Sequence, residues 1–168
     1  MLKFYHSDDR KEGAQMFHVV MVEPEIPQNT GNVARTCSVT GSCLHLIRPL
    51  GFSVDDKHLK RAGLDYWHTL DISYFDSLEE LQALYPEARF FYASTHASNR
   101  YTDTAFRDGD FLVFGKETAG LPKELLAKNA DHAIRIPMGE GQRSLNLSNS
   151  VAIVLYEALR QNNFLDLL

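Results

Sequence analysis

The sequence predicts an α/β fold in which helices cover both faces of a parallel sheet. Short apolar segments rich in β-branched residues alternate with segments of helical pattern, and the connections between them are short. Such alternation is typical of parallel sheets, because each helix carries the chain back to the start of the next strand. The 168 residues correspond to about one domain. We expect that domain to span residues 16–168, behind a flexible leader or tail over residues 1–15.

The first strand is predicted over residues 17–23, where an apolar, β-branched segment runs into a turn-rich one. A short helix over residues 32–40 ends at Gly41, because glycine readily adopts the left-handed conformation that closes helices. A second apolar strand follows over residues 43–47 and ends before Pro49.

The middle of the chain predicts a short polar helix over residues 55–62 and a weaker third strand over residues 69–74. Ser77 and Glu80 have the spacing of a capping box. They predict that a helix begins there and runs to residue 85.

Three further strands are predicted over residues 89–95, 110–114 and 132–136, with a helix over residues 122–128 after the second of them. The last helix, over residues 148–162, carries apolar residues at i, i+3 and i+4 spacing, which form a core-facing stripe. A neighbouring face of this helix is also apolar, through Ala152, Ile153 and Tyr156. We expect this second face to meet another subunit in a homodimer.

Composition excludes several classes of protein. Twenty-two acidic residues against 17 Lys and Arg give a net charge of −5, so any contact with nucleic acid depends on a local patch. Cys37 and Cys43 fit neither a disulfide scaffold nor a C-x-x-C metal site, and we expect two reduced thiols. No apolar run reaches the roughly 18 residues of a membrane span, and no signal-peptide core is present, so a cytoplasmic location is expected.

Ligands of such sheets bind beyond the carboxyl ends of the strands. After the first strand, Asn29 can cap or orient, Gly31 allows a tight start of the helix, and Arg35 lies one turn beyond Gly31 on the same helix face. An arginine on the buried side there suits an anion or an oxygen-rich ligand. Pairing of Arg35 with a nearby carboxylate is the open alternative.

Two later loops have the same character. After residues 110–114, Gly115 leaves room for a ligand near the backbone and places Glu117 beside it, although a solvated loop acid is the alternative for Glu117. This loop lacks the G-K-[ST] ending of a P-loop. Before the last helix, the segment with Ser144, Asn146 and Ser148 holds more small polar residues than a helix cap requires. One of the two serines is expected to cap the helix.

Together these segments resemble the three ordered motifs of the SPOUT class of RNA methyltransferases. The motifs are Asn29-x-Gly31-x-x-x-Arg35, Phe114-Gly-x-Glu-x-x-Gly-Leu-Pro122, and Ile134-Arg-Ile-Pro-Met138 with Ser144-Leu-Asn-Leu-Ser148. With Glu23-Pro-Glu-Ile-Pro27 and Arg61-Ala-Gly-Leu-Asp-Tyr66, the chain is most similar to the short, single-domain members that methylate the ribose 2′-OH of the tRNA wobble nucleotide, cytidine or uridine 34. The resemblance covers about residues 16–159.

The resemblance implies a Rossmann-like sheet whose C-terminal part forms a trefoil knot, and a homodimer built partly on the last helix. It also implies S-adenosylmethionine as methyl donor, with S-adenosylhomocysteine as product and no metal. The donor is implied to lie against the loops after the last three strands. The matching positions are Ala93, Gly115, Ile136, Met138, Ser144 and Leu145. In this scheme Arg35 stabilises the developing alkoxide, with uptake of the hydroxyl proton by Arg35 as the secondary alternative, and Asn29, Glu117 and Asn146 orient Arg35 or the ribose.

A modest basic patch is the candidate contact for the tRNA anticodon stem-loop. Its members are Arg48, Lys57, Lys60, Arg61 and, nearer the reaction, Arg143. The alternative is a solvated helix face.

Two other functions remain open from the residues alone. A nucleotide-dependent Rossmann enzyme would need an acid at the end of the second strand, but that strand ends at Arg48. A non-catalytic RNA-binding dimer would have no reason to combine all the polar residues of the three motifs.

Overall fold

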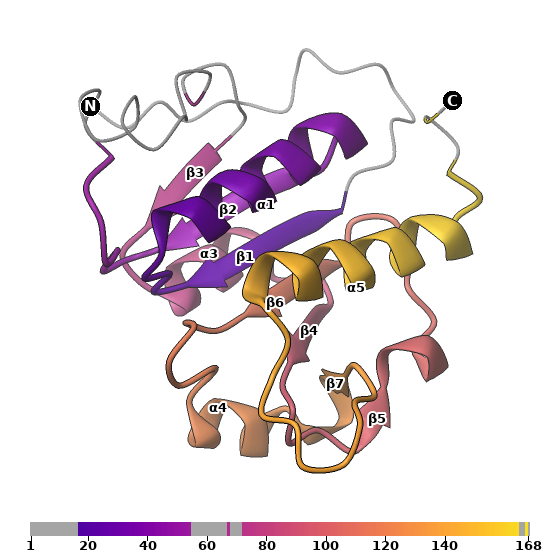
Figure 1. Cartoon of the computed structure of the whole chain (residues 1–168). Helices are drawn as coiled ribbons and strands as arrows, with labels where there is room; N and C mark the ends of the chain where they lie inside the picture. Colours follow the sequence, from indigo (N-terminus) through magenta and orange to yellow (C-terminus); the bar gives the residue numbers. More distant parts are fainter. Residues whose placement is uncertain (1–16, 55–66, 68–71, 165–166, 168) are drawn as a thin grey trace.

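The computed structural model describes residues 17–54, 67, 72–164 and 167. Its seven strands form one sheet in the order β3-β2-β1-β6-β4-β7-β5, and every pair is parallel (Figure 1). The strands are β1 (His18–Val22), β2 (Cys43–Ile47), β3 (Ile72–Phe75), β4 (Phe90–Ala93), β5 (Asn99–Arg100), β6 (Phe111–Phe114) and β7 (Ala133–Arg135). The predicted parallel α/β fold is confirmed. The polar helix predicted over residues 55–62 lies outside the described residues.

Helices cover both faces of the sheet, as predicted. On one face lie α1 (Pro27–Thr40) and α5 (Leu147–Gln161), which stand in front of the strands in Figure 1. On the other face lie α3 (Leu78–Leu84) and α4 (Lys123–Lys128). Alternate residues of β1 serve the two cores: Val19 and Met21 pack with α1 and α5, and Val20 packs with α3. Among the described residues, no helix is long and apolar enough to cross a bilayer.

Two features differ from the sequence prediction. Helix α1 begins at Pro27, five residues earlier than expected, so Gly31 lies inside the helix and does not form its start. Proline suits a first helical position, where its missing N–H needs no partner. The edge strand β5 was not predicted, because two exposed polar residues carry no apolar pattern. By contrast, the capping box at Ser77 is present, with its Oγ accepting from the Glu80 N–H at 3.1 Å.

The strand order determines which loops meet. The chain moves outward from β1 to β2 and β3, then returns to the other side of β1 to form β4 and β6. The loops after β1 and β6 are therefore neighbours at the carboxyl edge of the sheet. The ends of β6, β4 and β7 also lie side by side there.

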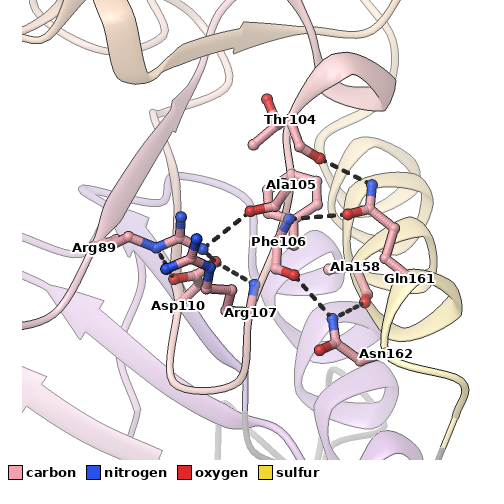
Figure 2. Close-up of polar contacts among 9 residues, drawn as sticks. All are labelled: Arg89, Thr104, Ala105, Phe106, Arg107, Asp110, Ala158, Gln161 and Asn162. Carbon is pink, nitrogen blue, oxygen red and sulfur yellow. Dashed lines mark hydrogen bonds and ion pairs between the residues drawn. The ribbon is translucent and has the colours of Figure 1, made fainter.

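The C-terminal end of α5 is fixed to the segment that precedes β6 (Figure 2). Gln161 accepts from the Phe106 N–H and donates to the Thr104 carbonyl, both at 2.9 Å. Asn162 donates to the Phe106 carbonyl at 3.2 Å. These bonds set the position of α5 along α1 and so determine where the start of α5 lies.

Candidate active site

The loops after β1 and β6 are joined by reciprocal carboxylate contacts. The Glu117 carboxylate accepts from the backbone N–H groups of Glu25, at 2.8 Å, and Ile26, at 3.2 Å. In return, the Glu25 carboxylate accepts from the backbone N–H and the hydroxyl of Thr118, both at 3.0 Å. We call these two loops, residues 23–26 and 116–118, the loop clamp.

A salt bridge adds to the loop clamp. Lys116 Nζ lies 2.8 Å from Glu23 Oε2. The hydrogen bond and the charge of Glu23 raise the pKa of Lys116. Glu23, Glu25 and Thr118 were not among the candidate residues predicted from the sequence. The sequence feature that could have indicated the two glutamates is that both stand next to a proline directly after β1.

Glu117 serves the start of α1 from a distant part of the chain. No side chain near Ile26, the N-cap position, caps the helix. The Glu117 carboxylate supplies an acceptor there from 91 residues away, at the helix end that favours negative charge. The alternative of a solvated loop acid is therefore wrong for Glu117.

One residue from each of the three motifs joins a hydrogen-bonded chain. Buried Asn29 donates from Nδ2 to Glu117 Oε1 at 3.0 Å, and its Oδ1 accepts from Asn146 Nδ2 at 3.0 Å. Asn146 Oδ1 in turn accepts from the Ser148 N–H at 2.9 Å and the Asn149 N–H at 3.3 Å. Asn146 therefore caps α5, and the prediction of a serine cap is wrong. Since both ends of the Asn29 amide are held, its orientation is fixed.

Gly115 is required by its own loop. A Cβ atom at Gly115 would lie 2.1 Å from the carbonyl carbon of Gly120. The loop turns back on itself through the hydrogen bond from the Gly120 N–H to the Lys116 carbonyl, at 2.8 Å, and Gly120 has φ +67°. The predicted reason for this glycine, room for a ligand, is corrected: the space is filled by protein backbone.

A second loop at this edge, residues 136–145, is open. Ile136 and Met138 are half-buried, as is Ala93 at the end of β4, whereas Ser144 and Leu145 are exposed. Within the described part of the chain, this loop contains one internal backbone hydrogen bond, from the Gln142 N–H to the Gly139 carbonyl. It therefore offers unused backbone donors and acceptors beside apolar side chains, which suits a ligand with an aromatic ring and polar edges.

Arg35 lies on the exposed side of α1, and the predicted position on the buried side is wrong. Its six-residue separation from Asn29 corresponds to about 9 Å along the helix and about 120° around it. Gly31, one turn before it, is buried. Arg35 thus leaves the helix on a different side from the Asn29 amide.

Comparison with known proteins gives the family. The model of the SpoU rRNA methylase family matches residues 16–156. The chain belongs to the SpoU methylase family. A relative from Methylovorus glucosotrophus, named tRNA (cytidine(34)-2′-O)-methyltransferase, is 49% identical over 150 residues, which are 89% of this chain and 97% of the relative.

Solved structures support the SpoU assignment. A structure described as giving insight into 2-OH methylation of C/U34 on tRNA has 48% identity and a TM-score of 0.81, covering 89% of this chain and 97% of that one. An AdoMet-bound rRNA methyltransferase from Sinorhizobium meliloti has 25% identity and a TM-score of 0.73, covering 88% of this chain and 57% of that one. The alternative of a nucleotide-dependent Rossmann enzyme is set aside by these matches.

The basic residues of this SpoU methylase are only partly described. Arg48 is exposed, forms a salt bridge of 2.8 Å with Asp76, and has its guanidinium 5.5 Å from the centre of the Tyr74 ring. Arg143 is exposed on the open loop. Lys57, Lys60 and Arg61 lie outside the described residues. Asp76 was not considered in the sequence, and it offsets the charge of Arg48.

Proposed function

We propose that this chain transfers a methyl group from S-adenosylmethionine to the ribose 2′-OH of the wobble nucleotide of tRNA, cytidine or uridine 34. It is a methyltransferase of the SpoU family, and the Methylovorus relative that carries this activity in its name matches nearly its whole length. The observation that carries the proposal is the hydrogen-bonded chain of Asn29, Glu117 and Asn146. It joins the three motif segments at the carboxyl edge of the sheet, where such folds bind ligands.

The residues at this edge fit the methyl donor. Bound S-adenosylmethionine supplies a methyl group on a positively charged sulfur and leaves as S-adenosylhomocysteine. The open loop and the strand ends beside it have apolar side chains for the adenine and unused backbone groups for its polar edge. The proposed contacts are Ala93, Gly115, Ile136, Met138, Ser144 and Leu145. Because such a site would bind the donor mainly through backbone groups, it needs no pattern of charged residues in the sequence.

The protein contributes positioning and charge to the reaction. The 2′-oxygen must approach the methyl carbon nearly in line with the sulfur, so a fixed geometry supplies much of the acceleration. The positively charged guanidinium of Arg35 stabilises the negative charge that develops on the oxygen as the hydroxyl proton leaves to solvent. Asn29, Glu117 and Asn146 act as positioning residues that hold α1 and α5 in one arrangement.

A homodimer through α5 is part of the proposal. Ile153 and Tyr156 are 37% and 45% exposed and lie one turn apart on α5. Val39 is exposed on the adjacent α1, which also carries Arg35, and Ile26 is exposed at the N-cap of that helix. A second subunit that covers this apolar surface would exclude water from the surroundings of Arg35, and charge stabilisation is stronger in such surroundings.

A trefoil knot is likewise proposed from the chain path. After β6, the chain crosses to β7 on the far side of β4 and then returns to place α5 against α1. This path is compatible with a knot, which also requires the C-terminal segment to pass through a loop formed earlier in the chain, as the resemblance to SPOUT enzymes implies. The fixed far end of α5 would keep such a knot tight.

The proposed RNA partner is the anticodon stem-loop, and the proposed location is the cytoplasm, where tRNA is found. Arg143 on the open loop lies beside the proposed donor contacts and would reach the nucleotide being methylated. The remaining proposed contacts are Arg48, Lys57, Lys60 and Arg61. Phosphate contacts by such residues position the RNA without reading its sequence.

The test is methyl transfer from labelled S-adenosylmethionine to tRNA, followed by mapping of the labelled nucleotide. We expect label on the ribose of nucleotide 34. Arg35→Ala should lower kcat by at least about 10²-fold, the scale seen when a charge-stabilising group is removed. Donor affinity should stay nearly unchanged, and Arg35→Lys should restore little because the planar fork is lost.

Arg107→Ala is the matched control, since Arg107 is exposed on the segment before β6, at the opposite edge of the sheet. It should keep normal turnover. Near-normal turnover of Arg35→Ala would remove the role given to Arg35. Absence of any label on tRNA would instead favour the non-catalytic RNA-binding dimer.

A further inference from the structure

Three metal-ligating side chains gather at the amino edge of the sheet, opposite the candidate active site. His18 opens β1, Cys43 opens β2, and the two are register partners across the parallel pair. His45 follows two residues after Cys43, so it points to the same face of the sheet. Their side chains are 8%, 6% and 3% exposed respectively.

The three ligand atoms lie close together. One ligand atom from each residue lies within 4.8 Å of the others. His18 Nδ1 is 2.8 Å from His45 Nε2.

His45 faces His18 through Nε2, so its other nitrogen, Nδ1, is not a zinc ligand and carries the ring proton when zinc is bound. Within the described part of the chain, Nδ1 of His45 is the buried side-chain polar atom without a hydrogen-bond partner. Leaving such an atom unsatisfied costs about 1–3 kcal/mol. The surroundings of this unpartnered nitrogen are apolar, because the rings of Phe111 and Phe75 pack against His45 at centroid distances of 5.6 and 5.8 Å.

We propose that His18, Cys43 and His45 form a zinc site. Imidazole nitrogen and thiolate sulfur are the ligands that zinc prefers, and tetrahedral geometry with Zn–N bonds of about 2.0–2.1 Å places two nitrogens about 3.3 Å apart. The 2.8 Å between the two imidazoles is only a few tenths of an ångström shorter. Zinc takes the place of their shared hydrogen bond, and the proton of that bond moves to the other nitrogen of its own ring. The Cys43 thiol loses its proton to solvent, and a water molecule completes the four ligands.

The position of the zinc site gives it a structural role. It ties the first residue of β1 to the first and third residues of β2, at the edge opposite the loop clamp. Exposed Tyr85 packs against both imidazoles, with ring centroids 5.5 and 6.4 Å away, so the cluster lies one side chain from solvent. Movement of Tyr85 is the route by which the ion enters.

The experiment compares thermal unfolding of the chelator-treated protein with and without zinc, and records the absorption spectrum with cobalt(II) in place of zinc. At free zinc 100 times above the Kd, the unfolding equilibrium should shift about 100-fold toward the native state. Cobalt(II) should give thiolate-to-metal charge-transfer absorption. Cys43→Ser should lose that absorption and most of the zinc stabilisation, and His45→Gln should lose most of the stabilisation.

Cys37→Ser is the matched control, because Cys37 is the other buried cysteine and lies on α1. It should keep both signals. No zinc stabilisation and no thiolate absorption in the unmodified protein would overturn the proposal, as would equal zinc stabilisation in Cys43→Ser. If Cys43→Ser does not fold, the cobalt spectra of the unmodified protein and of Cys37→Ser decide the matter.

Discussion

Two neighbouring regions at the carboxyl edge of the sheet are built in opposite ways. In the loop clamp, charged side chains cross between loops that are about 90 residues apart in the chain, and the carboxylates of Glu25 and Glu117 each accept at least two hydrogen bonds. The open loop, residues 136–145, has a single internal backbone hydrogen bond among the described residues. The polar groups of the loop clamp are paired within the protein, whereas the open loop leaves backbone polar groups available to a ligand.

The contrast shows how a site can be both rigid and adaptable. Hydrogen bonds to a charged acceptor contribute about 1.5–3 kcal/mol each, so the loop clamp is stable without a ligand. Asn146 links the regions, since it ends the open loop, caps α5 and donates to Asn29. A ligand that orders the open loop therefore acts, through Asn146 and Asn29, on the Glu117 carboxylate of the loop clamp.

The largest loss of stability at the loop clamp should come from Gly115→Ala, at the residue directly before its second loop. Its added Cβ would meet backbone at 2.1 Å, which no side-chain movement relieves. We expect a loss of about 3 kcal/mol in the free energy of unfolding, measured by urea denaturation. The control is Gly139→Ala in the open loop, whose Cβ would find its nearest neighbour at 3.8 Å and should change stability by less than about 0.5 kcal/mol. Equal losses in the two variants would show that the two loops do not differ.

Removing the carboxylate at the centre of the loop clamp should have the next largest effect. Glu117→Ala leaves the N–H groups of Glu25 and Ile26 and the Asn29 amide without their acceptor. We expect a loss of about 2 kcal/mol, and about half of it in Glu117→Gln, which keeps one oxygen. Thermal unfolding measures both.

Glu140→Ala supplies the comparison from the open loop. Glu140 is exposed, and its removal should change stability by less than about 0.5 kcal/mol. A fully stable Glu117→Ala protein would contradict the capping role given to this carboxylate.

The smallest effect on stability should come from the link between the two regions. Asn146→Asp keeps an oxygen that caps α5, and aspartate caps as well as asparagine does, so stability should change by less than about 0.5 kcal/mol. The donor to Asn29 is lost, and a carboxylate oxygen then faces the Asn29 Oδ1. We expect kcat for methyl transfer to fall about tenfold, equivalent to about 1.4 kcal/mol of barrier.

Asn146→Ala should lose the cap as well, about 1 kcal/mol, with a similar fall in kcat. Asn149→Ala is the control, because Asn149 takes part in the cap through its backbone N–H alone. It should keep both stability and turnover. Unchanged kcat in Asn146→Asp would show that the two regions act independently.

Much of the fold was predictable because its signals are local. The Ser77 capping box, the strand at residues 110–114 and the core stripe of α5 each depend on residues a few positions apart. The start of α1 was placed too late for the complementary reason: its acceptor, Glu117, lies 91 residues further along the chain, and no local pattern announces it.

The sequence by itself determined the parallel α/β architecture, the three polar loops and three of the residues that meet there, Asn29, Glu117 and Asn146. Periodicity and turn residues specify these through interactions between near neighbours. Only the tertiary structure decided that Asn146 caps α5, that Gly115 makes room for Gly120, and that Arg35 is exposed. Those outcomes depend on which strands become neighbours, and the strand order is set by packing across the whole sheet.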